Sequence, residues 1–158
     1  MRAQNDERFM LLAIEKAREG LQKGQSPFGV CLARSGRVVV TAHNRVWETS
    51  DITAHAEILA IREACARLNT VDLSGCTLYS TTEPCPMCFG AIHWARIDRI
   101  VYGATISDGK KAGFNELSLS NEQMKRLGGS AVEVERGVLR QECQALFKEW
   151  SRLGNPPY

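Results

Sequence analysis

Two short motifs separated by one predicted strand constrain the fold of this chain more than any other feature. His55 and Glu57 stand in the first motif, and Cys85 and Cys88 stand in the second. Each motif falls where a helix is predicted to begin, the first near residue 55 and the second near Pro86. The fold must therefore bring two helix N-termini to one place.

These residue types at this spacing predict a catalytic zinc site. A helix N-terminus favours negative charge, so Cys85 and Cys88 stand where their thiolates, the form that binds metal, are stabilised. With His55 they form a three-ligand set, which leaves the fourth tetrahedral position of Zn²⁺ open for water. Glu57 lies two residues from His55, off its helix face, and is predicted to carry protons as general acid and base.

Two other interpretations of Cys85 and Cys88 were weighed. A thioredoxin-like redox pair would not need the His-x-Glu motif. A structural site with four cysteines would need a second cysteine pair, yet the other cysteines are isolated in apolar segments and are expected in the core: Cys31, Cys65, Cys76 and Cys143. The single histidines His43 and His93 are expected to be structural. The sequence therefore predicts one metal site.

Length and charge place limits on the rest of the protein. A chain of 158 residues is expected to form one domain over residues 1–158. Each half of the chain, residues 1–79 and 80–158, holds 10 basic and 9 acidic residues, so no basic arm for a polyphosphate is evident. The apolar run Phe9–Ile14 is too short for a signal peptide or a membrane span. We expect a cytoplasmic protein without membrane contact.

The hydrophobic pattern predicts alternating strands and helices. A helix starting at Asn5 or Asp6 is expected to lie on a sheet, and strand Arg37–His43 is expected to bury Val38, Val39 and Val40. The expected elements are helix 5–24, strands 28–33 and 37–43, a helix from residue 54 or 55 with Ile58, Ile61, Cys65 and Leu68 on its apolar face, strand 77–81, helix 86–95, strands 99–104 and 131–134, and a last helix with its stripe at Leu139, Cys143, Leu146, Phe147 and Trp150. This order predicts an α/β fold, a three-layer α/β/α sandwich around a mixed five-stranded sheet.

The motifs resemble the zinc-dependent cytidine deaminase-like superfamily along nearly the whole chain, since His-x-Glu followed by Pro-Cys-x-x-Cys is the signature of zinc deaminases of nucleobases. Segments similar to tRNA adenosine deaminases are Thr53–Ile58, Glu83–Cys88 and Val138–Cys143. Segments similar to the small bacterial guanine deaminases are Pro27–Gly29, Gly90–Arg96 and Ala112–Glu116, together with the terminal Tyr158. We take the guanine deaminases as the nearer branch.

The resemblance to guanine deaminases implies further site residues. It makes Glu116 a second catalytic carboxylate and Asn44 the amide that binds the purine edge. It also makes the backbone N–H of Ala56 a donor to a ring carbonyl. It makes Phe28 a side chain that packs on the ring, Trp94 a pocket wall and Tyr158 part of a lid. Each side chain has a structural alternative: core packing for Phe28 and Trp94, a solvated loop for Glu116, a turn for Asn44 and a frayed end for Tyr158.

The function that the resemblance implies is hydrolysis of guanine to xanthine and ammonia by zinc-activated water. It also implies a homodimer whose C-terminal tail crosses to the partner's site. Two departures bear on this expectation: Asn115 stands where the family has an acidic residue, and Pro156 and Pro157 precede the terminal residue. A tRNA wobble adenosine deaminase and a deaminase of cytosine or another amino-substituted ring are the alternatives. A zinc-binding interaction domain without catalysis would leave Glu57 without a purpose.

Overall fold

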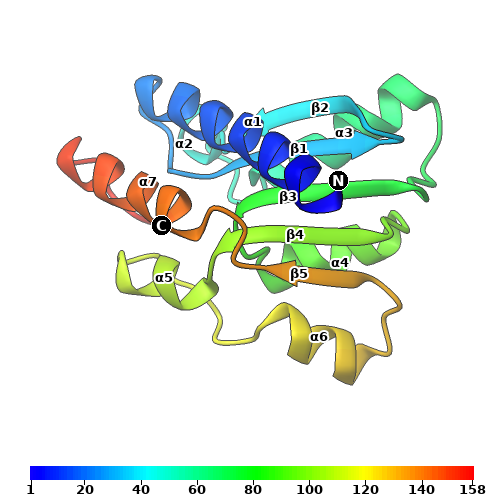
Figure 1. Ribbon diagram of the computed structural model, residues 1–158. Helices are drawn as coiled ribbons and strands as arrows, with labels where there is room; N and C mark the ends of the chain where they lie inside the picture. Colours follow the sequence, from blue (N-terminus) through cyan, green and yellow to red (C-terminus); the bar gives the residue numbers. More distant parts are fainter.

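A computed structural model describes the whole chain, residues 1–158, and centres on one mixed sheet (Figure 1). The strand order is β2-β1-β3-β4-β5, with β1 antiparallel to both of its neighbours and β3, β4 and β5 mutually parallel. The strands are β1 (Gly29–Arg34), β2 (Arg37–His43), β3 (Cys76–Thr82), β4 (Arg99–Ala104) and β5 (Glu133–Arg136). The predicted mixed five-stranded sheet is confirmed.

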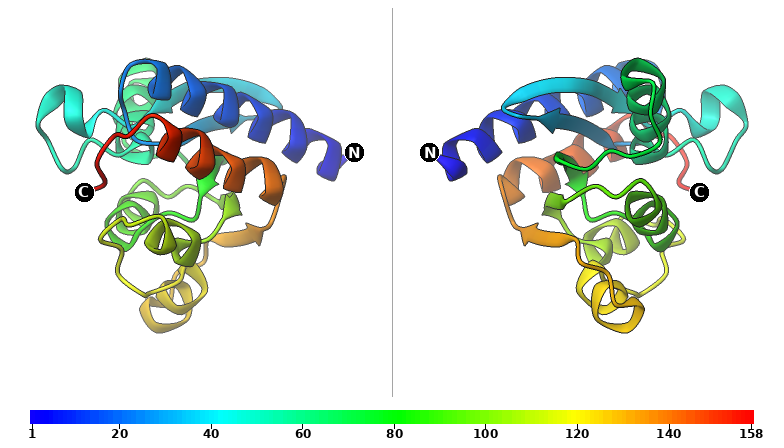
Figure 2. Two further views of the ribbon diagram at one scale, coloured as in Figure 1. Left: turned by 90° about the vertical axis from the view of Figure 1, so that its left-hand side faces the viewer. Right: turned by 90° about the vertical axis from the view of Figure 1, so that its right-hand side faces the viewer.

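Helices cover both faces of this sheet. The helices are α1 (Arg2–Gln22), α2 (Val46–Thr49), α3 (Ala56–Leu68), α4 (Pro86–Trp94), α5 (Ile106–Lys111), α6 (Asn121–Gly128) and α7 (Arg140–Arg152). Helices α1 and α7 pack on one face, and α3 and α4 pack on the other, as the edge-on views show (Figure 2). The predicted three-layer α/β/α architecture is therefore correct. No helix combines the length and the apolar character that a membrane span requires.

Strand β1 shows how the sequence builds these layers. Its alternating side chains enter opposite cores, Val30 and Leu32 on the α3 face and Cys31 and Ala33 on the α1 face. At Gly29, where β1 begins, a Cβ atom would lie 2.1 Å from the carbonyl oxygen of a residue in α1. Only glycine allows this approach, which fixes the start of β1 against α1.

Two details of burial differ from the prediction. Val38 is 42% exposed although we expected it in the core, because the register between β1 and β2 shifts after Leu32 and skips Val39. In α3, three alanines form the fully buried stripe, and the larger apolar side chains expected there are only half-buried: Ile58, Ile61, Cys65 and Leu68. The small alanine side chains let α3 approach the sheet closely.

Three short helices were not predicted, and some boundaries differ. Helices α2, α5 and α6 lie in short segments where apolar residues do not recur at helical spacing over several turns. A capping box starts each of α5 and α6, and this local signal was overlooked. Helix α1 begins at Arg2, before the expected cap, and β5 lies two residues later than expected.

The topology places several chain segments at one end of the sheet. Helix α4 begins beyond the C-terminal end of β3, and the loop to α5 leaves the adjacent end of the parallel strand β4. Helix α3 and α4 contact each other on the same face. The carboxyl ends of parallel strands are where open α/β sheets place ligand sites.

Candidate active site

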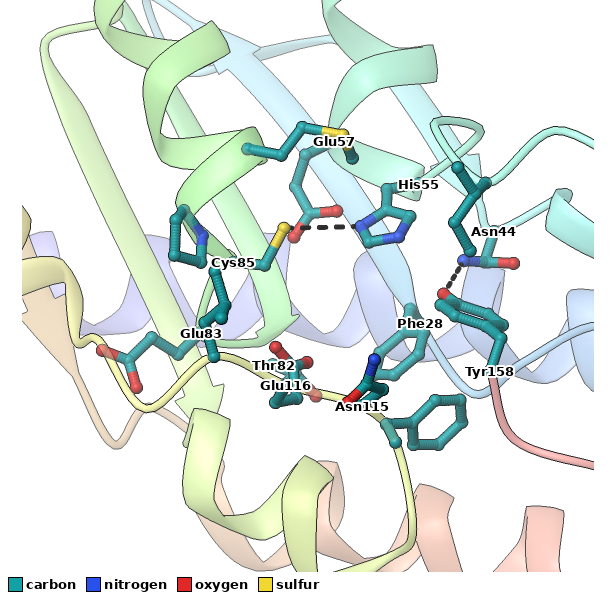
Figure 3. A pocket seen from close by; sticks show the side chains of 15 residues that line it. Phe28, Asn44, His55, Glu57, Thr82, Glu83, Cys85, Asn115, Glu116 and Tyr158 are labelled. Carbon is teal, nitrogen blue, oxygen red and sulfur yellow. Dashed lines mark hydrogen bonds between the residues drawn. The ribbon is translucent and has the colours of Figure 1, made fainter.

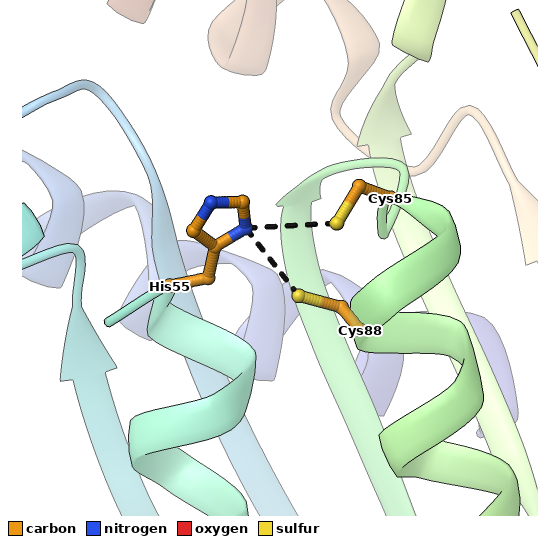
Figure 4. Close-up of side chains that lie close together, drawn as sticks. All are labelled: His55, Cys85 and Cys88. Atoms are coloured by element: carbon orange, nitrogen blue, oxygen red, sulfur yellow. Dashed lines mark hydrogen bonds between the residues drawn. The ribbon is translucent and has the colours of Figure 1, made fainter. Parts of the chain in front are cut away.

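Three predicted metal ligands meet at the N-termini of α3 and α4 (Figure 4). His55 is the residue immediately before α3, and Cys85 holds the same position before α4, with Cys88 in the first turn of that helix. The Nδ1 atom of His55 lies 3.6 Å from the Sγ atom of Cys85 and 3.5 Å from that of Cys88. The two predicted helix starts therefore converge.

The separations between these atoms fit a zinc ion. With Zn–S bonds of about 2.3 Å, Zn–N bonds of about 2.05 Å and a tetrahedral angle, ligand sulfur and nitrogen should lie about 3.6 Å apart. Both measured distances match this value. A hydrogen bond from the Cys88 thiol, assisted by His55, lowers the pKa of Cys85 to about 4, so this sulfur is a thiolate near neutral pH. His55, Cys85 and Cys88 would hold Zn²⁺ and leave one position for water.

Glu57 lies beside this triad in the first turn of α3. Its side chain is buried, and burial raises its pKa above the ordinary range. The hydroxyl of Ser80, which donates to the carbonyl oxygen of Thr82 at 2.6 Å, lies 3.3 Å from Glu57 Oε1. Glu57 forms no salt bridge and faces the pocket. Such a carboxyl group can exchange a proton with a molecule next to the metal site.

A pocket of about 260 Å³ opens at the triad (Figure 3). Its walls come from the β1 entrance, the loop after β2, the start of α3, the β3–α4 loop, the α5–α6 loop and the C-terminus: Phe28, Asn44, Ile52, His55, Glu57, Thr82, Glu83, Cys85, Pro86, Met87, Phe114, Asn115, Glu116, Leu117 and Tyr158. Pockets for drug-sized ligands occupy roughly 300–1,000 Å³, so this one suits a single small ring system.

Asn44 and Tyr158 form one polar wall of the pocket. Asn44 is fully buried, and its Oδ1 atom accepts a hydrogen bond from the backbone N–H of Val46 at 3.0 Å. Its Nδ2 atom donates to the hydroxyl of Tyr158 at 2.5 Å. Because the amide oxygen is already used, the NH₂ group is the end of Asn44 that faces the pocket. This side chain therefore offers donors rather than acceptors to a ligand.

Phe28 lies next to Tyr158, and Glu116 lies farther along the pocket wall, below His55 in Figure 3. The ring of Phe28 packs against that of Phe114 at a centroid distance of 4.9 Å. Glu116 is half-buried, and burial together with the nearby Cys85 thiolate raises its pKa to about 7. A carboxyl group near its pKa at neutral pH can both give and take a proton. The carboxyl group of Glu116 thus lines the pocket together with those of Glu57 and Glu83.

The structure places Trp94, which the resemblance makes a pocket wall, outside the pocket of this chain. Trp94 is the last residue of α4 and is 85% exposed. Eight residues of helix separate it from Pro86, which is about 12 Å along the axis. Ala56 is buried at the first position of α3, where its backbone N–H has no partner within the helix.

The C-terminal tail closes the pocket of its own chain. The ring of Tyr158 lies 5.6 Å from that of His55, and its backbone oxygen accepts a hydrogen bond from the N–H of Asn115 at 2.9 Å. The resemblance implied instead that the tail crosses to a partner subunit. The terminal residue is therefore ordered against the pocket, and the exchange of the tail between subunits stays a prediction.

Sequence reasoning overlooked several pocket residues. Phe114 and Asn115 stand beside Glu116 in the segment Ala112–Glu116, but no chemical role was given to either. Glu83 belongs to the motif before Cys85, yet it gave no signal of its own because its partners lie in helices that were not predicted. Ile52, Met87 and Leu117 are exposed apolar residues at the pocket rim.

Comparison with known proteins agrees with this geometry. Residues 3–104 match the cytidine and deoxycytidylate deaminase zinc-binding region. The chain is 36% identical to the guanine deaminase of Bacillus subtilis, over 96% of this chain and 97% of that protein. It is 38% identical to the tRNA-specific adenosine deaminase of the same organism, over 93% and 89% of the two chains.

A solved structure supports the same assignment. The guanine deaminase from Nitrosomonas europaea superposes with a TM-score of 0.85 at 33% identity, over 92% of this chain and 84% of that one. The predicted zinc ligands fall inside the matched zinc-binding region, and their geometry fits the ion. Zn²⁺ is therefore the cofactor, and the chain belongs to the zinc-dependent cytidine and deoxycytidylate deaminase family.

Proposed function

We propose that this deaminase acts on a free purine base and converts guanine and water to xanthine and ammonia. The observation that carries the proposal is Glu116, a second carboxyl group inside a pocket that the chain's own C-terminus closes. Guanine carries an N–H beside the amino group that leaves, and a carboxylate can accept a hydrogen bond from it. Adenine has no hydrogen at that ring position.

The polar groups of the pocket match the two edges of guanine. The NH₂ group of Asn44 and the backbone N–H of Ala56 supply donors for the carbonyl oxygen and the ring nitrogens. Glu116 supplies the acceptor. Phe28 lends an apolar face to the ring, and Tyr158 closes the site from the tail side. A guanine ring in contact with these side chains would fill a pocket of about 260 Å³.

Two carboxyl groups carry the proton transfers of the proposed reaction. Zn²⁺ bound to His55, Cys85 and Cys88 would supply a water molecule that ionises near neutral pH. Glu57 accepts the proton that this water loses and delivers it to the ring nitrogen beside C2, where the oxygen adds. Glu57 then takes the proton of the hydroxyl added at C2 and, helped by Glu116, passes it to the amino group, which leaves as ammonia while the carbonyl forms at C2.

The alternative function is deamination of a tRNA wobble adenosine, and two findings favour it. The identity to the tRNA-specific relative equals that to the guanine deaminase within a few percent. Helix α5 also carries exposed Lys110 and Lys111 beside the segment that forms the pocket wall. Against it, Tyr158 lines the pocket beside His55, which leaves less room for a base that is still joined to an RNA strand.

An ammonia-release assay tests the substrate. Guanine, guanosine, adenine, cytosine and an anticodon stem-loop are offered to the same zinc-quantified preparation. We expect guanine to be the only strong substrate, with little dependence on salt. Inosine formed in the stem-loop at a comparable rate, weakened by rising salt as phosphate contacts require, would replace our choice with the tRNA enzyme.

We also propose that the protein is a homodimer through the outer face of α4. Met87 and Trp94 lie two helical turns apart and are 38% and 85% exposed, with the small residues Gly90 and Ala91 between them. Such a stripe fits a second copy of the chain, as the resemblance implies. Sedimentation of the wild type and of Trp94→Glu tests this: a wild-type monomer at micromolar concentration excludes the dimer, and a monomeric variant supports it.

A further inference from the structure

Glu83 is a buried carboxylate that the proposed chemistry does not use. It follows β3 directly and is only 5% exposed. Its backbone N–H donates to the carbonyl oxygen of Ala104, the last residue of β4, at 2.8 Å. Figure 3 shows its side chain turned away from His55, on the Cys85 side of the pocket. A buried acid without a basic partner requires other donors.

Both oxygens of Glu83 accept hydrogen bonds from backbone groups that start helices. Oε2 accepts from the N–H of Ile106 at 3.0 Å, and Oε1 accepts from the N–H of Asn121 at 2.9 Å. Ile106 is the first residue of α5, and Asn121 is the first residue of α6. One carboxylate therefore joins the beginnings of two helices that are remote from it in sequence.

The capping of both helices explains why these two N–H groups need Glu83. A capping box satisfies the N–H groups of the cap residue and of the third helical residue in α5, through Thr105 and Asp108. The same arrangement operates in α6 through Ser120 and Gln123. A capping box leaves the first helical N–H without a partner, and in both helices Glu83 accepts from that group.

The segment between these two helix starts forms one wall of the pocket. Its residues Phe114, Asn115, Glu116 and Leu117 all line the cavity. Asn121 makes a second hydrogen bond to the same loop: its side-chain Nδ2 donates to the carbonyl oxygen of Pro84 at 2.7 Å. Pro84 precedes the zinc ligand Cys85. The wall that carries Glu116 is thus bonded at both ends to the loop that carries the metal ligands.

We propose that Glu83 is a positioning residue: it holds the Glu116 segment against the zinc-ligand loop and so sets where the second carboxyl group meets the substrate. The inference rests on the proposed role of Glu116 in the reaction. It assigns no contact with the substrate to Glu83. A shift of about 1 Å in a catalytic group can cost up to about a hundredfold in rate, so this link has a measurable consequence.

A double-mutant cycle tests whether Glu83 acts through Glu116. Glu83→Gln keeps the shape of the side chain but places an NH₂ group against one of the two backbone donors. We expect it to lower kcat about tenfold when Glu116 is present and less than twofold in the Glu116→Gln background. Equal losses in both backgrounds would show a general structural effect and overturn the proposal, as would loss of zinc from Glu83→Gln.

The assay uses whichever substrate the wild type deaminates fastest. Failure of the guanine proposal therefore appears as a different preferred substrate, whereas failure of this inference appears as additive losses. The matched control is Glu122→Gln, which removes an exposed acidic group from the first turn of the same helix, α6. It should leave kcat and the zinc content unchanged.

Hydrogen–deuterium exchange gives a readout that does not depend on activity. Peptides covering residues 112–120 should exchange faster in Glu83→Gln than in the wild type or in Glu122→Gln. Unchanged exchange in this segment would overturn the inference even if kcat falls. Should Glu83→Gln not fold, Glu83→Asp, which keeps the charge on a shorter stem, should show the same localised exchange with a smaller loss of rate.

Discussion

The two ends of the parallel strands β3 and β4 both bury acidic side chains, but they surround them differently. At the starting end, Asp6 receives hydrogen bonds from Arg99 Nη1 and Nη2 at 2.7 and 2.9 Å and from the hydroxyl of Tyr79 at 2.9 Å. At the finishing end, Glu57 and Glu116 form no salt bridge and share the pocket with the metal ligands. The Asp6 carboxylate is thus paired with a buried arginine, whereas the carboxyl groups of Glu57 and Glu116 have no arginine or lysine partner.

This difference separates a structural cluster from a reactive one. Burial opposes ionisation of Asp6, yet the hydrogen bonds from Arg99 and Tyr79 hold its pKa below the ordinary value. Burial raises the pKa of Glu57 and of Glu116, and no arginine offsets it. Buried acidic groups with a raised pKa and no cationic side chain to hold their charge are candidates for proton transfer. Substitutions at the two ends should therefore affect different measurements.

The largest expected effect is on turnover at the finishing end. Glu57→Gln should lower kcat by about three orders of magnitude or more, because the amide cannot accept and return a proton. Zinc content should stay at the wild-type level, since Glu57 is not a ligand. Elemental analysis and the ammonia assay on one preparation check both expectations, with Glu63→Gln on the exposed side of α3 as the control. Retained turnover would exclude Glu57 as the proton carrier.

At the starting end the expected loss is in stability alone. Asp6→Asn removes the buried, doubly bonded partner of Arg99 and leaves only the longer ion pairs with the half-exposed Glu133 and Glu135, at 3.4 and 3.7 Å. It should lower the free energy of unfolding by about 3 kcal/mol. Activity per zinc-loaded folded molecule should stay within about twofold. Denaturant titration and the ammonia assay measure the two quantities, and the exposed neighbour Glu7→Gln serves as the control. A selective loss of kcat would mean that the two ends are not independent.

The pH dependence of stability should follow Asp6. Its pKa in the folded protein lies below the usual 3.8, so its stabilisation is complete above that value and is lost as the pH falls through the lower folded pKa. The difference in stability between wild type and Asp6→Asn should therefore be constant from pH 7 to about pH 5 and shrink below pH 4. A difference that grows in acid would contradict the pairing.

Glu116→Gln should have a smaller effect on turnover than Glu57→Gln. We expect kcat to fall about a hundredfold, since one of two proton-carrying groups remains. Zinc content should not change. Steady-state kinetics on guanine measure the loss, and Glu122→Gln again provides a charge-matched control. Unaltered kinetics would make Glu116 a solvated loop residue and remove the main support for guanine as substrate.

The smallest expected effect concerns the tail. Tyr158→Phe keeps the ring over His55 but removes the hydroxyl that binds Asn44, which is worth about 1 kcal/mol in a typical hydrogen bond. We expect KM to rise about threefold with kcat nearly unchanged, because Asn44 is then less firmly oriented. A fall in KM would show that the hydroxyl competes with the base for Asn44.

The zinc centre and the layers were predictable from sequence because they depend on local patterns. Two helix starts carry the ligands, and alternation in β1 and the stripes of α1 and α7 place the sheet between two cores. The exposed position of Val38 was not predictable, since it depends on a register shift between two strands. The orientation of α3 was not predictable either. Its alanines face the sheet, and its larger apolar side chains are only half-buried.

The polar connections of the site could not be derived from sequence. Glu83 accepts hydrogen bonds from Ile106 and Asn121, which begin α5 and α6. Neither helix shows apolar residues at helical spacing over several turns, so neither contact could be predicted. The exposed position of Trp94 at the end of α4 could not be derived from the motif, because the motif does not show where the helix ends relative to the pocket. Tyr158 is positioned by hydrogen bonds to residues that are distant in sequence, Asn44 and Asn115.

The close approach of α1 at Gly29 has a kinetic consequence for the pocket. The backbone next to Phe28 cannot move away from α1 without disrupting the sheet. The tail, in contrast, is held by two hydrogen bonds, to Asn44 and Asn115, and by the packing of the Tyr158 ring on neighbouring rings. The least costly way to open the cavity is to lift the tail. We expect base and product to exchange past Tyr158, so that the residence time of the product reports the opening rate of the last residues.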